Sequence, residues 1–269
     1  MSDIAAVVFD WAGTVVDFGC VAPVRALEAA FAAEGVKITE AQARKDMGKA
    51  KRDHVAALLA DSDVVGAWLG RFGVSPAGTD VDRIYEAVGP LMLREAARCS
   101  ALIPGAAEIV DWLQKRGVKI GSSTGYTRAM MQGILPRAAA QGYAPSVVVC
   151  ADDTKVGRPS PLPMWKALSE LAAYPAWRAV KVDDSVVGIE EGRAAGSWTI
   201  GLSASGNGVG LSLEDWLALP ESEQKKRAEA SAAALRDAGA DYVIATIADS
   251  KDTFTDIERR IARGERPKA

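Results

Sequence analysis

Residues 4–14 read Ile4-Ala5-Ala6-Val7-Val8-Phe9-Asp10-Trp11-Ala12-Gly13-Thr14, and this stretch decides the fold class of the chain. The run up to Phe9 is wholly apolar, which is typical of a strand buried on both faces in a parallel sheet. Asp10 then ends the run, and Gly13 and Thr14 break the pattern. The stretch therefore predicts a buried parallel strand with a carboxylate at its carboxyl end.

Beyond Pro104-Gly105, helical and strand-like segments alternate to the end of the chain. Strands are expected at 118–122, 146–150, 179–182, 198–202 and 242–244. Helices are expected at 106–115, 128–141, 162–172, 188–195, 213–217, 224–238 and 253–263. This alternation predicts an α/β fold with a doubly wound, Rossmann-like core and a mostly parallel sheet. The glycine- and serine-rich residues 203–210 are expected to form a surface loop.

Residues 18–102 carry no convincing strand pattern. Helices are expected there at 23–34, 53–60, 64–72 and 81–98. Thr39 and Gln42 have the spacing of a capping box, which predicts a further helix start. We therefore expect an all-helical cap domain at 19–100, inserted into a core domain made of 1–18 and 101–269.

The composition excludes several classes of protein. Of 269 residues, 49% are hydrophobic and 25% charged, and the formal net charge of -3 offers no basic surface to nucleic acid. The cysteines at 20, 99 and 150 are odd in number and have no metal-type spacing, which favours a reducing cytoplasm. No signal-peptide pattern or membrane-spanning apolar stretch is present. We expect a cytoplasmic protein whose partner is a small molecule, not nucleic acid or a membrane.

Chemically assorted polar residues follow the predicted strands, at the edge where parallel sheets bind ligands. They are Asp10, Ser123, Thr124, Arg158, Asp183 and Asp184. Singly, an aspartate after a strand is often a turn former or a helix cap, and an arginine is often a solvated surface charge. Together, carboxylates, a hydroxyl and a cation suit a metal such as Mg²⁺ and a phosphoryl group.

This ordered set resembles the haloacid dehalogenase superfamily, whose first motif corresponds to residues 10–14. The resemblance implies that Asp10 is the nucleophile that becomes an aspartyl phosphate. It also implies that Mg²⁺ is bound by Asp10, Asp184 and the backbone carbonyl of Ala12. The resemblance spans nearly the whole chain.

The same resemblance implies a phosphoryl-binding set. Ser123 or Thr124, followed by Gly125, would contact the phosphoryl oxygens, and Arg158 stands where relatives carry a lysine or arginine. One position departs from the wider class, since many relatives have an aspartate where this chain has Gly188. Candidates for the missing acceptor, listed in chain order, are Asp183, Glu190 and Glu191.

Ala12 separates the possible chemistries. Phosphatases of this class usually carry a second aspartate two residues after the nucleophile, where it protonates the departing alkoxide. Alanine cannot transfer a proton. A reaction with a carbon leaving group, stabilised by other means, would not need that acid.

Two longer strings are similar to the phosphonoacetaldehyde hydrolase family. One is residues 10–20, and the other is 47–54, Met47-Gly48-Lys49-Ala50-Lys51-Arg52-Asp53-His54. The resemblance implies that Lys51 forms a Schiff base with the substrate aldehyde, that His54 shuttles protons and that Met47 contacts the substrate. The iminium would act as an electron sink for breaking a carbon–phosphorus bond.

The implied reaction converts phosphonoacetaldehyde to acetaldehyde and phosphate. The family acts in 2-aminoethylphosphonate degradation, after a transamination, and its members are homodimers. Both properties are expectations from the resemblance, since neither can be derived from the residues.

Two alternatives stay open. The first is a sugar-phosphate phosphatase or phosphoglucomutase of the same fold, which Ala12 disfavours because both need the missing acid. The second is a non-catalytic binding module, which the joint presence of Asp10, Arg158 and Asp184 disfavours. By local pattern alone, the charged run around Lys51 is typical of a solvated helix face.

Overall fold

One parallel sheet forms the centre of the molecule in the computed structural model, which describes residues 2–268. The strands are β1 (Ala6–Phe9), β2 (Lys119–Ser123), β3 (Val147–Val149), β4 (Ala179–Asp183), β5 (Trp198–Leu202) and β6 (Tyr242–Ile244). Their order is β3-β2-β1-β4-β5-β6, and all five neighbouring pairs are parallel. This confirms the predicted doubly wound sheet. The strand order reverses between β1 and β4, the point where such sheets open a ligand crevice.

Helices cover both faces of the sheet, because alternate residues of β1 are apolar on each side. Val7 and Phe9 pack into one core with α6 (Ala106–Lys115) and α13 (Ser250–Ala262). Ala6 and Val8 pack into another core with α9 (Leu162–Glu170). The remaining core helices are α7 (Arg128–Met131), α8 (Leu135–Ala140), α10 (Val186–Ala194), α11 (Leu213–Ala218) and α12 (Glu221–Asp237).

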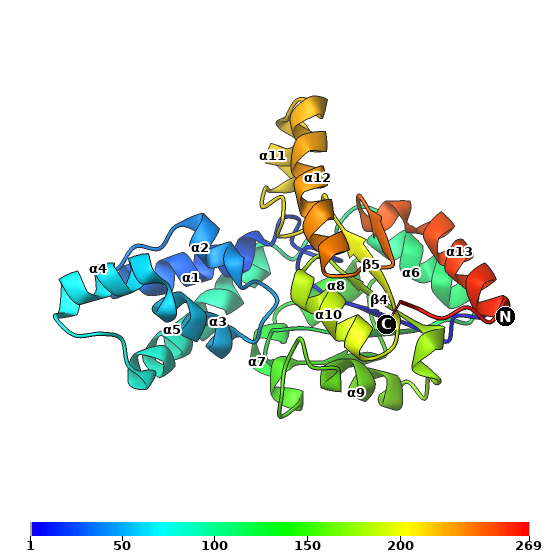
Figure 1. The fold of residues 1–269 in the computed structure, drawn as a ribbon, viewed down its shortest axis with the longest axis horizontal. Coiled ribbons are helices and arrows are strands. Elements are labelled where there is room, and N and C mark those ends of the chain that lie inside the picture. The colour runs from blue at the N-terminus through cyan, green and yellow to red at the C-terminus, as the bar shows by residue number, and fades with distance from the viewer. Residues whose placement is uncertain (1, 269) are drawn as a thin grey trace.

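Five helices between β1 and α6 form a separate group to the left of the sheet (Figure 1). They are α1 (Val21–Ala33), α2 (Glu40–Lys45), α3 (Lys51–Ala60), α4 (Ser62–Phe72) and α5 (Gly78–Arg98). No strand lies between β1 and β2 in the part of the chain that the structure describes, which confirms the predicted helical insertion. The exact domain boundaries stay a prediction.

Two predicted segments differ from the structure. The single helix expected at 128–141 is two short helices, because Gly133 loosens the first and Pro136 starts the second near the N-terminus of α8. The prediction that residues 203–210 form a surface loop is wrong, since most of these residues are buried. Their small size allows close packing: the fully buried Ser205 hydroxyl donates to the Gly13 carbonyl at 2.8 Å.

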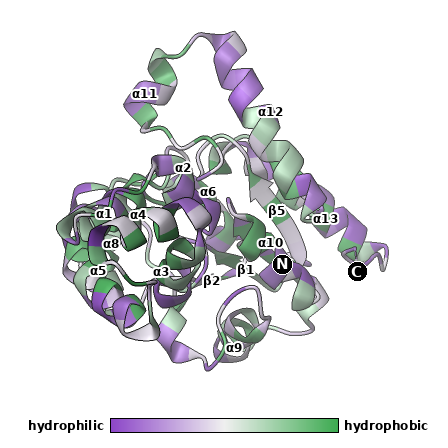
Figure 2. Ribbon diagram, turned by 60° about the vertical axis from the view of Figure 1, so that its left-hand side comes forward, coloured by the Kyte–Doolittle hydropathy of each residue, from purple (hydrophilic) through white to green (hydrophobic). Residues whose placement is uncertain are grey.

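The hydropathy of α12 changes along the helix according to what it packs against. In Figure 2 the outer part of this helix is hydrophilic and the part against the sheet is more hydrophobic. Among the helices of residues 2–268, none has the length and apolar composition that crossing a bilayer requires.

Candidate active site

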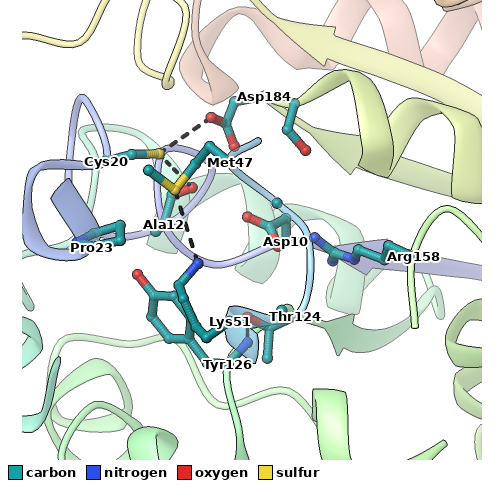
Figure 3. A pocket seen from close by; sticks show the side chains of 13 residues that line it. Asp10, Ala12, Cys20, Pro23, Met47, Lys51, Thr124, Tyr126, Arg158 and Asp184 are labelled. Carbon is teal, nitrogen blue, oxygen red and sulfur yellow. Dashed lines mark hydrogen bonds and ion pairs between the residues drawn. The ribbon is translucent and has the colours of Figure 1, made fainter. Parts of the chain in front are cut away.

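A cavity lies between the carboxyl ends of the central strands and the helical insertion (Figure 3). The atom-free space between its walls, including space open to solvent, is about 330 Å³. Eight of the ten predicted site residues line it, namely Asp10, Ala12, Met47, Lys51, Thr124, Gly125, Arg158 and Asp184. The other two, Ser123 and His54, are buried beside it.

Asp10 directly follows β1, and both its backbone and its side chain form hydrogen bonds. Its backbone N–H donates to the Val182 carbonyl on β4 at 2.9 Å. Arg158 Nη1 donates to its Oδ1 at 2.8 Å. Burial, together with the charge of Asp183, raises the pKa of Asp10 to about 6, although Arg158 opposes the shift. The carboxylate is thus fixed in orientation, and it faces the cavity.

Asp10, Asp183 and Asp184 form a buried carboxylate cluster, with one oxygen of each within 4.8 Å of the others. Burial and the charges of the other two aspartates raise the pKa of Asp184 to about 8. The Asp184 carboxylate accepts hydrogen bonds from Thr14 Oγ1 at 3.2 Å and the Asn207 N–H at 2.8 Å. Mutual repulsion of this kind is relieved by a bound cation, so the cluster fits a metal with oxygen ligands.

Asp183 occupies the space of the aspartate that is missing at position 188. A Cβ built on Gly188 would lie 1.9 Å from Asp183 Oδ2. The Asp183 Oδ1 accepts from the Ser185 hydroxyl at 2.7 Å and from its N–H at 2.9 Å. Of the three candidates from the sequence, the structure therefore places Asp183 in the cluster.

A buried polar network supports the floor of the cavity. Lys181, fully buried in β4, lies 2.9 Å from Glu191 Oε2 and 3.2 Å from Asp183 Oδ2. Its amine also donates to the Ser123 hydroxyl at 2.7 Å. Arg158 Nη2 donates to the same hydroxyl at 3.0 Å, and Arg158 Nε lies 3.1 Å from Glu191 Oε2. Ser123 therefore orients Arg158 from the buried side of the cavity wall, while Thr124 lines the cavity itself.

The charges around this floor are unbalanced. The carboxylates are Asp10, Asp183, Asp184 and Glu191, and the cations are Arg158 and Lys181. With all four carboxylates ionised, the negative charges exceed the positive ones by two, and without a cation the raised pKa of Asp184 relieves part of this excess by protonation. A divalent cation would restore the balance, which is a second reason why these residues fit a metal.

Replacing Lys181 with methionine should destabilise the protein by about 3–5 kcal/mol, because it leaves buried carboxylates with too few partners. Urea unfolding measures the loss. Glu191→Gln in the same chain should recover part of it by removing one unpaired charge. Lys166→Met, which breaks an exposed ion pair to Glu170, is the control and should leave the unfolding free energy nearly unchanged. Equal effects of the two lysine variants would contradict the network.

Lys51 begins helix α3 and brings an amine from the insertion into the cavity. Its side chain is buried, with Nζ 4.0 Å from Met47 Sδ and 5.4 Å from the centroid of the Tyr126 ring. No carboxylate of the described residues lies within ion-pair distance of it. Burial lowers the pKa of Lys51 to about 8. Roughly a tenth of the amine is therefore unprotonated at pH 7, far more than for an ordinary lysine.

His54 lies one turn after Lys51 on α3 and is fully buried. Burial, and next the charge of Lys51, lowers the pKa of His54 to about 3. No described side chain hydrogen-bonds to either ring nitrogen. The ring is thus neutral and would hold a proton only transiently, and its role as a proton shuttle stays a prediction.

Two glycines let the insertion approach the core. A Cβ on Gly125 would lie 2.7 Å from the Lys49 carbonyl oxygen, and one on Gly48 would lie 2.5 Å from a Val187 methyl group. The loop that leads into α3 therefore lies directly on the core. This contact places Lys51 over the strand ends.

Several residues of the site were not predicted. Cys20 and Tyr126 line the cavity, and the Cys20 thiol donates to the Ala12 carbonyl at 3.2 Å. Lys181 carried a signal, because a charge within an apolar strand run needs a buried partner. Tyr126 carried none, and the glycine- and serine-rich composition of residues 203–210 indicated a surface loop instead.

Known proteins resemble this chain over nearly all its length. Residues 4–196 match the haloacid dehalogenase-like hydrolases. The phosphonoacetaldehyde hydrolase of Paraburkholderia phytofirmans is 46% identical to it, over 99% of this chain and 100% of that protein. The phosphonoacetaldehyde hydrolase of Hahella chejuensis is 42% identical, over 98% of this chain and 90% of that protein.

Comparison with solved structures gives the same result. The crystal structure of a phosphonoacetaldehyde hydrolase-like protein from Oleispira antarctica matches with a TM-score of 0.97 at 43% identity, covering 98% of this chain and 96% of that one. The β-phosphoglucomutase of Clostridium difficile, with a TM-score of 0.68 at 14% identity over 97% of this chain and 99% of its own, shares the fold. The chain is a haloacid dehalogenase-like hydrolase and belongs, within that class, to the phosphonoacetaldehyde hydrolase family.

Proposed function

We propose that this enzyme hydrolyses the carbon–phosphorus bond of phosphonoacetaldehyde to give acetaldehyde and phosphate. The observation that carries the proposal is the meeting of two nucleophiles in one cavity: the Lys51 amine from the insertion and the Asp10 carboxylate from the core. Phosphonoacetaldehyde carries an aldehyde at one end and a phosphonate at the other. The amine would react with the aldehyde and the carboxylate with the phosphonate.

The amine of Lys51 attacks the aldehyde carbon, and loss of water gives an iminium. An oxygen of Asp10 then attacks phosphorus as the carbon–phosphorus bond breaks. The electron pair of that bond forms the carbon–carbon double bond of an enamine, and the π pair of the iminium moves to nitrogen. Protonation of the enamine carbon and hydrolysis of the iminium release acetaldehyde and the free amine. Water finally cleaves the aspartyl phosphate, which releases phosphate and restores Asp10.

The metal we propose is Mg²⁺, which when bound would offset negative charge on the phosphoryl oxygens. Asp10, Asp184 and the Ala12 carbonyl would hold it, and Asp183 would support it. On the protein side, Arg158 keeps the Asp10 carboxylate in place at 2.8 Å. Thr124 and Gly125 line the cavity next to Asp10, where they would contact the phosphoryl group.

Ala12 favours this chemistry over phosphate-ester hydrolysis. It lines the cavity where an acid would be needed for an alkoxide leaving group, and it cannot supply a proton. A carbon leaving group that departs as an enamine needs no proton at that moment. The phosphatase and phosphoglucomutase alternatives both need an acid at this position.

Two further features stay proposals that rest on the resemblance. We place the reaction in 2-aminoethylphosphonate degradation, after the transamination that yields the aldehyde. We also expect a cytoplasmic homodimer.

The test is to incubate the purified protein with phosphonoacetaldehyde and measure both products. Acetaldehyde and phosphate should appear in equal amounts, and a chelator should stop both until Mg²⁺ is restored. Phosphoglycolate and glucose 6-phosphate serve as control substrates and should release little phosphate. Faster phosphate release from these esters than from phosphonoacetaldehyde would support the phosphatase alternative instead.

A further inference from the structure

Arg44, on helix α2 of the insertion, bonds to chain segments outside the insertion helices. Its Nη1 donates to the Gly19 carbonyl at 2.8 Å, in the linker before α1. Its Nη2 donates to the Gly210 carbonyl at 2.8 Å, in the loop after β5. Glu40, one turn earlier on α2, accepts from Arg44 Nε at 2.8 Å. Only 14% of the Arg44 side chain is exposed, so these contacts fix the guanidinium at the junction.

Asn207, in the same loop, exchanges two hydrogen bonds with Arg44. Arg44 Nη1 donates to Asn207 Oδ1 at 3.2 Å, and Asn207 Nδ2 donates to the Arg44 carbonyl at 3.0 Å. A reciprocal pair of this kind fixes both the distance and the orientation of the two segments. Asn207 keeps these two side-chain hydrogen bonds only while α2 stays against the loop.

The loop also holds a carboxylate of the site. The backbone N–H of Asn207 donates to Asp184 Oδ2 at 2.8 Å. A Cβ built on the preceding Gly206 would lie 2.2 Å from Asp184 Cβ, so the loop backbone lies directly against this aspartate. Hydrogen bonds therefore connect the insertion to Asp184 through one intermediate residue. Arg44 is bonded to Asn207, and Asn207 is bonded to the Asp184 carboxylate.

We propose that Arg44 is a positioning residue that makes the placement of the Asp184 carboxylate depend on closure of the helical insertion. When the insertion moves away, Asn207 loses both side-chain partners, and its N–H no longer holds Asp184 firmly. By linkage, a metal bound at Asp184 then favours the closed insertion to the same degree. The inference rests on the proposed function only in treating Asp184 as a metal ligand.

The first test measures Mg²⁺ binding by calorimetry without substrate. Arg44→Gln and Asn207→Ala should each weaken binding about tenfold, which is typical for the loss of a group that orients a metal ligand. The double variant should bind no more weakly than Arg44→Gln, because both changes break one path. Arg83→Gln is the matched control, since Arg83 pairs with Glu34 and Asp80 inside the insertion, and it should bind normally.

The second test measures backbone hydrogen exchange in the metal-free protein. Residues 203–210 should exchange faster in Arg44→Gln and in Asn207→Ala, while the strands keep their protection. Asn207→Ala retains the backbone N–H that reaches Asp184, so it separates loss of support from loss of the bond itself. It also keeps the test open should Arg44→Gln fold poorly.

Three results would overturn the proposal. These are normal Mg²⁺ binding and exchange in Arg44→Gln, additive losses in the double variant, and an equal loss in Arg83→Gln. Neither measurement uses phosphonoacetaldehyde, so failure to cleave that substrate would leave the proposal standing. If the wild type binds no Mg²⁺, the metal assignment fails, and the exchange data alone decide on Arg44.

Discussion

Asp10→Asn should abolish turnover of phosphonoacetaldehyde, with a loss of roughly four to six powers of ten, as is typical when a nucleophile is removed. An amide nitrogen or oxygen in place of the carboxylate cannot form the acyl phosphate. Binding of Mg²⁺ should weaken as well, since a charged ligand is lost. Phosphate release at saturating substrate and Mg²⁺ is the measurement.

Loss of the fold would not explain this result. Burial and Asp183 raise the pKa of Asp10 from 3.8 to about 6. In the absence of a metal, its ionisation therefore lowers the stability of the fold as the pH rises through this interval, and the loss is complete above it. A neutral amide avoids this loss and keeps an oxygen for Arg158. Asp111→Asn, at an exposed ion pair with Lys115, is the control and should retain normal turnover. More than a trace of activity in Asp10→Asn would exclude Asp10 as the nucleophile.

The second large effect is expected at the amine. Lys51→Arg keeps a positive charge, but a guanidinium does not deprotonate in proteins and cannot form an imine. Loss of the electron sink should cost several powers of ten in rate, at about 1.4 kcal/mol of barrier for each. The fold and Mg²⁺ binding should persist. Phosphate release, together with borohydride trapping of the protein–substrate adduct, measures the effect.

The pH dependence gives this prediction a second readout. Burial lowers the pKa of Lys51 to about 8, so the fraction of free amine rises with pH through that value. Adduct formation in the wild type should therefore increase between about pH 7 and 9.

Two further variants sharpen the comparison. Lys51→Met, which has a similar length and no charge, should be as inactive as the arginine variant. Lys49→Arg is the control, because Lys49 pairs with Asp46 at 2.5 Å and is partly exposed, and it should turn over normally. Near-normal phosphate release by Lys51→Arg would exclude the Schiff base.

The core half of the site could be predicted from the sequence because strand ends can be located. A short apolar run ends at Asp10, and another ends before Asp183 and Asp184. Parallel strands end at the same edge, so these carboxylates had to be neighbours. Arg158 followed from its place in the same series, although nothing in the sequence indicated that Ser123 would support it from below.

The cap half could not be derived in this way. Helical periodicity gives the helices of the insertion but not how they sit on the core. The assignment of Lys51 therefore needed the resemblance, since a charged run at a helix start is usually exposed. The 203–210 loop shows the opposite error: small polar residues suggested a surface, yet they allow the backbone to pack against Asp184.

The position of β1 at the centre of the sheet has a consequence for how the protein is made. Ala6 pairs with Lys119 on one side and Ala179 on the other, so β1 is synthesised well before both of its partner strands, which are encoded far downstream. The insertion helices pack largely on one another and can form earlier. Such distant pairing slows folding and leaves an apolar strand exposed for longer. In a newly made chain the helical insertion can therefore fold before the sheet that carries Asp10 and Asp184 is complete, and truncated chains lacking β4 would be inactive and prone to aggregate.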